Sequence, residues 1–108
     1  METNLSPGCG WTNDYDANCK FTQQLVNEAK KSGKSIGLYA SRYMWTTIMG
    51  GTDKCTFFGN LPLWYAHYDK NPSFDDWTAF GGWSHPTIKQ YQGTTPMCDA
   101  SVDLNYKP

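Results

Sequence analysis

Carboxylic acids are the residues of this sequence best suited to chemistry, since ten Asp and Glu occur among its 108 residues. Two such groups placed across a sugar bond hydrolyse it, one of them held protonated as the acid. Asp103 stands out because it lies between Val102 and Leu104, where an acid within a strand needs a reason to face inward; a structural role is equally open. Seven further acids suit loops or a solvated helix face: Asp14, Asp16, Glu28, Asp53, Asp75, Asp76 and Asp99.

Other catalytic chemistries find little support. No G-x-S-x-G nucleophile motif occurs, and Gly8-Cys9-Gly10 lacks the strand and helix that flank a phosphate-binding loop. His67 and His85 do not stand at metal-ligand spacing, and His67 is expected to pack on a strand. We therefore expect neither a metal ion nor a cofactor.

Four cysteines form an even set: Cys9, Cys19, Cys55 and Cys98. They contain no close C-x-x-C pair, so two disulfides in an oxidising compartment are favoured over a zinc site. Three pairings are possible. We expect Cys9–Cys19, closing a Gly- and Asn-rich loop, and Cys55–Cys98, tying a mid-chain loop to the last strand.

Composition narrows the range of partners. The net charge of -1 gives no general electrostatic attraction for nucleic acid or an anionic membrane, and no apolar run approaches a membrane span. Five Trp and seven Tyr are many for this length. Such rings either fill the core or stack against sugars, since each carries a polar tip that burial would have to satisfy.

Helix and strand patterns alternate along most of the chain. A helix is predicted from about Asn18, its N-cap, to Ser32, with an apolar stripe formed by Phe21, Leu25, Val26 and Ala29. Residues 35–40 predict a buried strand, after which Ser41 caps a second helix that ends at Gly50-Gly51. The second half predicts strands at 63–68, 87–91 and 102–106, and a loop at 70–86 with one helical turn near Asp75.

This order predicts an α/β fold with mostly parallel strands and two helices. Four strands and two helices cannot cover both faces of a parallel sheet, so the pattern indicates part of a larger barrel. Barrel enzymes place their chemistry at the C-terminal ends of strands. That rule singles out Glu2, Tyr39, Ser41, residues 67–69, Gln90, Tyr91 and Asp103.

Several motifs together resemble one family. The stretch GLYAS at 37–41, then Trp45 and LPLWYAHY at 61–68, is similar to the lysozymes of glycoside hydrolase family 25, the Chalaropsis-type muramidases. The resemblance continues through FGGW at 80–83, KQY at 89–91 and VDLNY at 102–106. It is strongest to the cysteine-containing forms of amoebae and nematodes.

The resemblance implies the C-terminal part of an irregular (β/α) barrel, truncated at the N-terminus, with residues 1–108 as a partial lysozyme domain. It implies cleavage of the β-1,4 bond between N-acetylmuramic acid and N-acetylglucosamine. The family signature is Asp-x-Glu, and Met1-Glu2 resembles its last two letters, which makes Glu2 the implied general acid. Asp103 matches the acid of the final strand. The implied substrate-binding residues are Tyr39, Trp64, Tyr91, Ser41 and Gln90.

Bacterial peptidoglycan is the implied partner, with no nucleic-acid or membrane partner, a monomeric state and a secreted or lysosomal/phagosomal location. The family's first-strand Asp and the Asp of its signature have no counterpart in this sequence, so weak or absent activity is expected. Two alternatives stay open. One is a non-catalytic glycan-binding remnant that uses Trp64, Tyr39 and Tyr91, and the other is a dimer of two half-barrels joined through their open edges.

Overall fold

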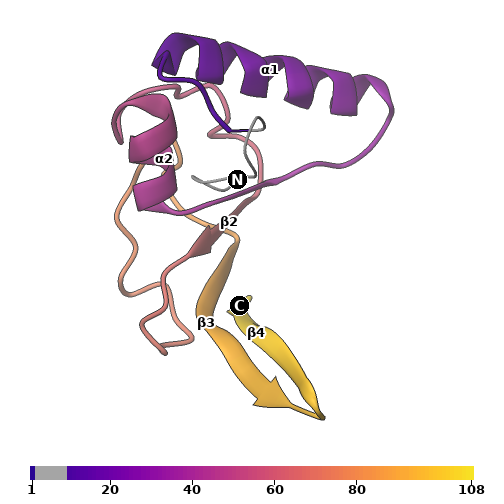
Figure 1. Ribbon diagram of the computed structural model, residues 1–108, viewed down its shortest axis with the longest axis vertical. Helices are drawn as coiled ribbons and strands as arrows, with labels where there is room; N and C mark the ends of the chain where they lie inside the picture. Colours follow the sequence, from indigo (N-terminus) through magenta and orange to yellow (C-terminus); the bar gives the residue numbers. More distant parts are fainter. Residues whose placement is uncertain (2–9) are drawn as a thin grey trace.

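The computed structural model describes Met1 and residues 10–108, so Glu2 and Cys9 lie outside the described residues. The described part contains six elements, in the order α1 (Tyr15–Lys31), β1 (Leu38–Ala40), α2 (Arg42–Met49), β2 (Leu63–Ala66), β3 (Ile88–Met97) and β4 (Ala100–Tyr106). Helix α1 lies at one end of the molecule, and the β3–β4 hairpin projects from the other (Figure 1).

Helix α1 begins three residues before its predicted N-cap. Asp14 caps it, since its carboxylate accepts a hydrogen bond from the backbone N–H of Ala17 at 3.1 Å. Asn18 is instead buried inside the helix, where its amide donates to the carbonyls of Thr12 at 3.0 Å and Ile48 at 2.9 Å. The prediction of Asn18 as N-cap was wrong because this side chain joins α1 to α2.

The predicted apolar stripe of α1 is only partly buried. The buried line of the helix consists of Asn18, Thr22 and Val26. Phe21 and Leu25 lie beside this line and are 54% and 59% exposed. Polar residues fit the buried positions because the Thr22 hydroxyl donates to the Asn18 carbonyl at 2.9 Å, which leaves no donor unsatisfied.

Helix α2 follows the prediction. The Ser41 hydroxyl oxygen accepts from the backbone N–H of Met44 at 3.0 Å, and Gly50 ends the helix with φ of 93°, a left-handed conformation that favours glycine. Trp45 and Ile48 enter the core from this helix. Strand β1, which directly precedes Ser41, is therefore followed at once by a rigid element.

The four strands form one sheet in the order β1-β2-β3-β4. The first two pairings are parallel, as expected, and β3 pairs with β4 antiparallel. The two closing strands are longer than predicted and form a hairpin. Its turn, Cys98-Asp99, has positive φ at both residues, 52° and 61°, the conformation that suits a two-residue hairpin turn.

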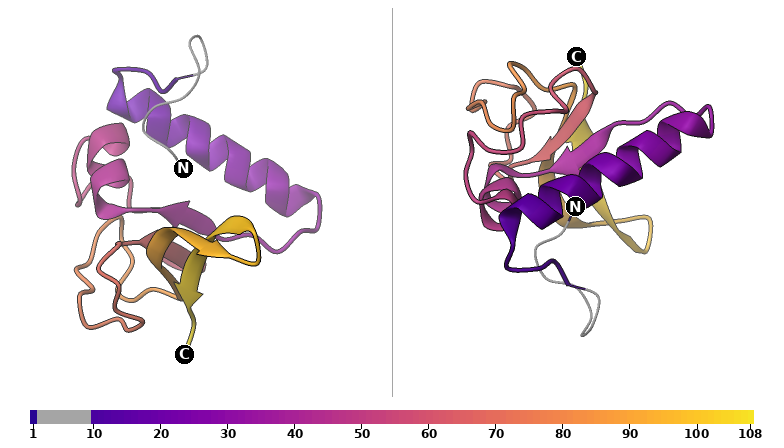
Figure 2. Two further views of the ribbon diagram at one scale, coloured as in Figure 1. Left: turned by 60° about the horizontal axis from the view of Figure 1, so that its bottom comes forward. Right: turned by 90° about the horizontal axis from the view of Figure 1, so that it is seen from above.

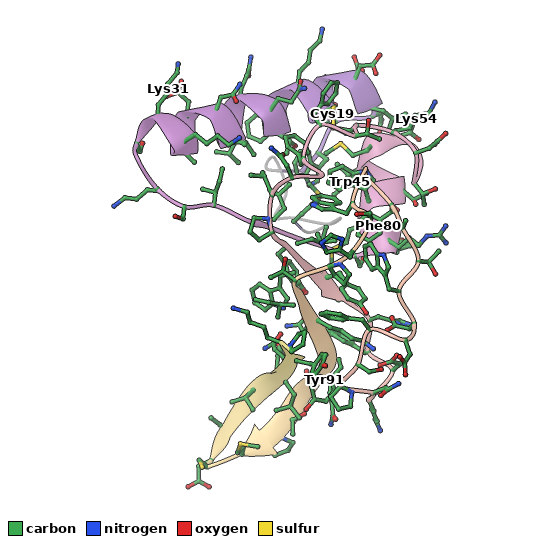
Figure 3. All side chains as sticks on the ribbon, turned by 180° about the vertical axis from the view of Figure 1, so that it is seen from behind. Cys19, Lys31, Trp45, Lys54, Phe80 and Tyr91 are labelled. Carbon is green, nitrogen blue, oxygen red and sulfur yellow. A yellow bond between two sulfur atoms is a disulfide. The ribbon has the colours of Figure 1, made fainter. Side chains whose placement is uncertain are left out.

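Both helices pack on one face of this sheet. Ala40, Leu63 and Tyr65 point from the strands into a core that Trp45 and Trp83 complete. Figure 2 shows α1 and α2 together on that side, and Figure 3 shows Trp45 and Phe80 next to each other, with ring centroids 6.2 Å apart. The described residues thus form an open, mixed α/β sheet and do not close into a barrel.

The connection from β2 to β3 contains turns and bends rather than a helix. The helical turn predicted near Asp75 is absent from this described segment. A short chain reversal, Trp77 N–H to Phe74 carbonyl at 2.9 Å, takes its place. The two parallel strands are therefore joined by a long loop that other contacts must hold in shape.

One disulfide joins Cys19 of α1 to Cys55 in the loop after α2. Figure 3 shows its sulfur bond near Cys19. The predicted partners Cys9–Cys19 and Cys55–Cys98 were wrong. Cys98 is exposed in the hairpin turn and forms no disulfide with the described residues, because the hairpin carries it away from the body that contains Cys55 (Figure 1).

Candidate functional site

The face of the sheet opposite the helices carries a line of polar and aromatic side chains. Residues paired across neighbouring strands point to the same face. Tyr39 pairs with Trp64 across β1 and β2, and Gln90 pairs with Asn105 across β3 and β4. Trp64 also pairs with Ile88, which brings β3 into the same line. Each of the four strands thus contributes a side chain to this face.

Gln90 lies at the centre of a hydrogen-bonded cluster on that face and is only 4% exposed. Its Oε1 accepts from the hydroxyl of Tyr39 at 2.6 Å and from the hydroxyl of Tyr68 at 2.9 Å. Its Nε2 donates to Oδ2 of Asp103 at 3.0 Å. We call these four residues the Gln90 cluster.

Asp103 has two donors within the hairpin. Besides the Gln90 amide, the backbone N–H of Thr94 donates to Oδ1 of Asp103 at 3.0 Å. The pairing of β3 with β4 shifts register twice between Gln90 and Thr95, and Thr94 has a positive φ of 51°. Such irregularities re-aim side chains and backbone groups. The carboxylate is therefore held at both oxygens while its residue stays exposed.

Trp64 supplies an accessible ring beside the cluster. Its indole N–H donates to Oδ1 of Asn105 at 2.8 Å, and its ring meets that of Tyr39 edge to face, with centroids 4.7 Å apart. The residue is 37% exposed. A ring held at its polar tip and open on its apolar surface can stack against a ligand without reorganising.

The structure brings four of the predicted site residues together: Tyr39, Trp64, Gln90 and Asp103. Ser41 instead caps α2, and Tyr91 is half-buried on β3, where its carbonyl accepts the N–H of Lys70 at 3.0 Å. Figure 3 labels Tyr91 at the base of the hairpin.

Three further residues bear on the site. Tyr68 belongs to it and lies within residues 67–69, which the strand-end rule singled out, although the family resemblance did not imply it as a substrate-binding residue. Asn105 also belongs to it and was not predicted, although it alternates with Asp103 on β4. Glu2 lies outside the described residues. Its neighbour Met1 donates through its amino group to the Tyr39 carbonyl at 3.0 Å, so the described start of the chain lies at the edge of β1.

A second polar cluster lies on the helix-bearing face, around Lys89. The ammonium of Lys89 is fully buried and donates to Oδ2 of Asp69 at 2.8 Å and Oδ1 of Asp76 at 2.7 Å. Tyr65 donates its hydroxyl to Asp76 at 2.8 Å, and Nδ1 of His67 lies 2.6 Å from the other oxygen of Asp76. These contacts, the Lys89 network, hold the loop between β2 and β3 against the sheet.

Charge pairing inside this network outweighs the cost of burial. Burial alone would raise the pKa of Asp69 and of Asp76, but the hydrogen bonds from Lys89 lower both pKa values below the ordinary value of 3.8. Burial alone would lower the pKa of Lys89, and its bonds to the two aspartates raise it above 10.5. Burial and the bond to Asp76 raise the pKa of Tyr65. All three charges of the network are therefore present at neutral pH.

Two predictions fail at this network. Asp76 was expected in a solvated loop, but its side chain is only 15% exposed, and His67, expected to pack on a strand, has a side chain that is 57% exposed. His67, Asp69 and Asp76 offer ligand atoms within 4.8 Å of one another, a spacing that a metal ion could bridge. Lys89 already places a cation between the two carboxylates, so this arrangement is an ion-pair network rather than a metal site.

A pocket of about 520 Å³ opens at the C-terminal ends of β1 and β2. Its walls come from the start of α2, the end of β2 and the loop around Trp77, and they are lined by rings and by polar groups: Ser41, Arg42, Tyr43, Met44, Tyr65, Ala66, His67, Tyr68, Asp76, Trp77, Thr78 and Phe80. Tyr68 belongs both to this pocket and to the Gln90 cluster. The C-terminal ends of strands are where α/β folds bind ligands.

No helix among the described residues is long and apolar enough to cross a bilayer.

Comparison with known proteins identifies the family. The sequence model of the family described as "Lysozyme-like protein 1" matches residues 4–91. The "Probable GH family 25 lysozyme 3" of Dictyostelium discoideum is 45% identical over 102 residues, which cover 94% of this chain and 20% of that protein. The "Lysozyme-like protein 5" of Caenorhabditis elegans is 40% identical over 101 residues, covering 91% of this chain and 45% of that protein.

The fold has a match among solved structures. The muramidase from Acremonium alcalophilum superposes with a TM-score of 0.72 at 21% identity, over 98% of this chain and 48% of that chain. The chain therefore spans less than half the length of the relatives described here. Since the family model covers most of the sequence and the relatives come from an amoeba and a nematode, as the motifs indicated, the chain belongs to the lysozyme-like proteins of glycoside hydrolase family 25.

Proposed function

We propose that this chain acts on bacterial peptidoglycan, cleaving the β-1,4 bond between N-acetylmuramic acid and N-acetylglucosamine as part of a muramidase site. The observation that carries the proposal is the Gln90 cluster beside Trp64, on the face of the sheet opposite the helices. It combines a fixed carboxylate, tyrosine hydroxyls and an accessible ring. Such a set suits a sugar, whose hydroxyls need polar partners and whose C–H face packs on a ring.

Each residue has a distinct role in this proposal. Glu2 is the general acid by its match to the family signature, and Asp103 supplies the negative charge that stabilises positive charge developing on the sugar. Trp64 and Tyr39 stack against the glycan. The hydrogen bond from the Met1 amino group to the Tyr39 carbonyl supports this assignment. It holds Met1, which is the neighbour of Glu2 in the sequence, against β1 and close to the cluster.

The likeness to a muramidase structure supports a barrel-type arrangement for a whole family 25 domain. We propose that residues 1–108 form one part of a family 25 domain, with the open sheet continuing into an irregular (β/α) barrel. A TM-score of 0.72 over 48% of a muramidase chain supports this placement. The Cys19–Cys55 disulfide suits an oxidising compartment, and so supports a secreted or lysosomal location.

A second candidate function is glycan binding without cleavage. Hydrolysis of a glycosidic bond requires two carboxyl groups across the bond. Among the described residues, Asp103 is the one carboxylate hydrogen-bonded within the Gln90 cluster. The rings and hydroxyls of this face would bind a glycan even where the second carboxylate is absent or misplaced.

Clearing of a bacterial cell-wall suspension and pull-down on insoluble peptidoglycan separate these candidates. We would compare the parent chain with Glu2→Gln and Asp103→Asn, and use Glu28→Gln as the matched control, since Glu28 is exposed on α1 and pairs only with Lys31 among the described residues. Clearing that the first two changes abolish and the control retains supports the hydrolase. Binding without clearing, unaffected by Glu2→Gln, supports the binding module. A parent chain that neither binds nor clears refutes both.

A further inference from the structure

We propose that Gln90 is the positioning residue of this site: one buried amide that fixes Asp103, Tyr39 and Tyr68 for the glycan without contacting it. This inference rests on the proposed function for its purpose and on the Gln90 cluster for its geometry. It reassigns Gln90, which the sequence alone placed among the substrate-binding residues. At 4% exposure the amide has no surface to offer a ligand.

The orientation of the amide follows from chemistry rather than from a choice between two flips. An ionised carboxylate only accepts hydrogen bonds, so the group that faces Oδ2 of Asp103 at 3.0 Å has to be Nε2. The carbonyl Oε1 then faces both tyrosines. Because that oxygen only accepts, the hydroxyls of Tyr39 and Tyr68 both donate to it, at 2.6 and 2.9 Å. One side chain thereby sets the direction of three hydrogen bonds.

The connectivity shows why this position matters. Tyr39 comes from β1, Tyr68 follows β2, and Asp103 comes from β4, while Gln90 sits on β3 between them. Each of the three outer side chains is hydrogen-bonded to the Gln90 amide. The amide is thus their shared partner. Sub-ångström placement of site groups depends on such supporting bonds, whose loss misplaces every group at once.

Replacing Gln90 by glutamate gives a test with a defined sign. The change is nearly isosteric and converts the donor that faces Asp103 into a second carboxyl. Two carboxyl groups at about 3 Å share one proton and hold it well above the pH at which an isolated carboxyl is ionised. While that proton is present, the introduced glutamate donates to Asp103 as Nε2 does. Once it is lost, two negative charges repel. The titratable groups facing this position are Asp103, Tyr39 and Tyr68.

We would measure peptidoglycan binding and wall clearing from pH 4.5 to 8 for the parent chain, Gln90→Glu and Gln90→Met. The control is Gln24→Glu, the same substitution at an exposed position of α1. Thermal unfolding of each protein is followed over the same pH range. For Gln90→Glu we expect binding to fall about tenfold or more at pH 8, the size of a lost charge-assisted hydrogen bond, and to approach the parent value at the acid end.

Gln90→Met removes donor and acceptor together, so its loss of binding should not recover at any pH. This difference separates positioning from a merely structural role, which would damage both variants alike. Equal, pH-independent losses in the two Gln90 variants, or no loss in either, would overturn the proposal. Gln24→Glu should follow the parent throughout.

The unfolding curves keep the inference testable if the proposed function fails. A parent chain that neither binds nor clears refutes the function. The difference in melting temperature between the parent and Gln90→Glu still reports on the geometry of the amide. We expect this difference to widen as the pH rises. A gap that stays constant between pH 4.5 and 8 would refute the placement of the amide against Asp103.

Discussion

Replacing Lys89 by methionine should destabilise the protein more than any surface charge change. Lys89 is fully buried, and its ammonium is the cation paired with Asp69 and Asp76, whose side chains are 23% and 15% exposed. Methionine fills a similar volume but leaves two neighbouring carboxylates without their countercharge. Breaking a buried pair in this way costs about 3–5 kcal/mol. Since the carboxylates keep some contact with water, the lower end of that range, about 3 kcal/mol, is our expectation.

A loss of this size is large for a domain of 108 residues. Such domains have free energies of unfolding of roughly 5–15 kcal/mol, and each kcal/mol shifts the melting temperature by about 4 °C or more. Lys89→Met should therefore lower the melting temperature by at least about 10 °C. Urea unfolding followed by tryptophan fluorescence at pH 7, with the disulfide oxidised, measures the free energy directly.

The pH dependence of the loss tests its cause. Because the pKa values of Asp69 and Asp76 are lowered, the stabilisation that these two carboxylates contribute is fully present above pH 3.8, the ordinary pKa of an aspartate. It is lost as the pH falls through the lowered pKa values. The raised pKa of Lys89 means that its part persists up to 10.5 and is lost only as the pH rises beyond that. In Lys89→Met the two carboxylates lack a cation, so protonation relieves them. The difference in free energy of unfolding between Lys89→Met and the parent should therefore shrink as the pH falls from 7 to 3.

Two controls accompany this measurement. Lys31→Met makes the same substitution at an exposed ion pair, where Lys31 and Glu28 are 74% and 72% exposed, and should leave the unfolding curve unchanged. Adding Asp69→Asn and Asp76→Asn to Lys89→Met should recover part of the loss, because no uncompensated charge remains. A deficit below about 1 kcal/mol, or one that does not change with pH, would refute the assignment of the loss to broken charge pairing.

Three further expectations concern the core, the disulfide and the ring beside the site. Replacing Cys19 and Cys55 by serine should lower the free energy of unfolding by about 3–4 kcal/mol, because the disulfide closes a loop with a sequence separation of 36 residues. Peptide mapping of the oxidised parent should recover a peptide linked through Cys19 and Cys55, and any other pairing would contradict the fold. Trp45→Ala should cost about 3–5 kcal/mol in urea unfolding, because this ring is fully buried and its N–H bonds to a backbone carbonyl. Trp64→Ala should weaken peptidoglycan pull-down while changing the melting temperature far less than Trp45→Ala; unchanged pull-down would remove this ring from the proposed site.

Local signals in the sequence predicted the elements whose ends are set by neighbouring residues. The cap of α2 by Ser41 and its end at Gly50 depend only on groups a few positions away, and both were read correctly. The family motifs also placed Tyr39, Trp64, Gln90 and Asp103 in one site, where the structure brings them together. The prediction for α2 holds because a short stretch of sequence contains all the partners, whereas the site residues lie far apart in the chain and were brought together by the family resemblance.

The failures share a cause, namely partners distant in the chain. Asn18 was predicted as a helix cap because the local sequence does not show its hydrogen bond to the carbonyl of Ile48, which is 30 residues away in the chain. Asp76 resembles a solvated loop acid until Lys89 is placed against it. The cysteine pairing depends on where the hairpin carries Cys98. Local sequence holds none of this information, since burial and charge pairing are properties of the folded chain.

The two-residue turn at Cys98-Asp99 has a consequence for the order of folding. A hairpin closed by so short a turn forms in microseconds, whereas parallel pairing of β2 with β3 must first close a loop of more than 20 residues. We therefore expect β3 and β4 to pair early and to present a template on which the slower, non-local strands assemble. Gln90 and Asp103 would then already be neighbours when Tyr39 and Tyr68 arrive. Pulse-labelled hydrogen exchange should protect the amides of the hairpin before those of β1 and β2, and simultaneous protection would contradict this order.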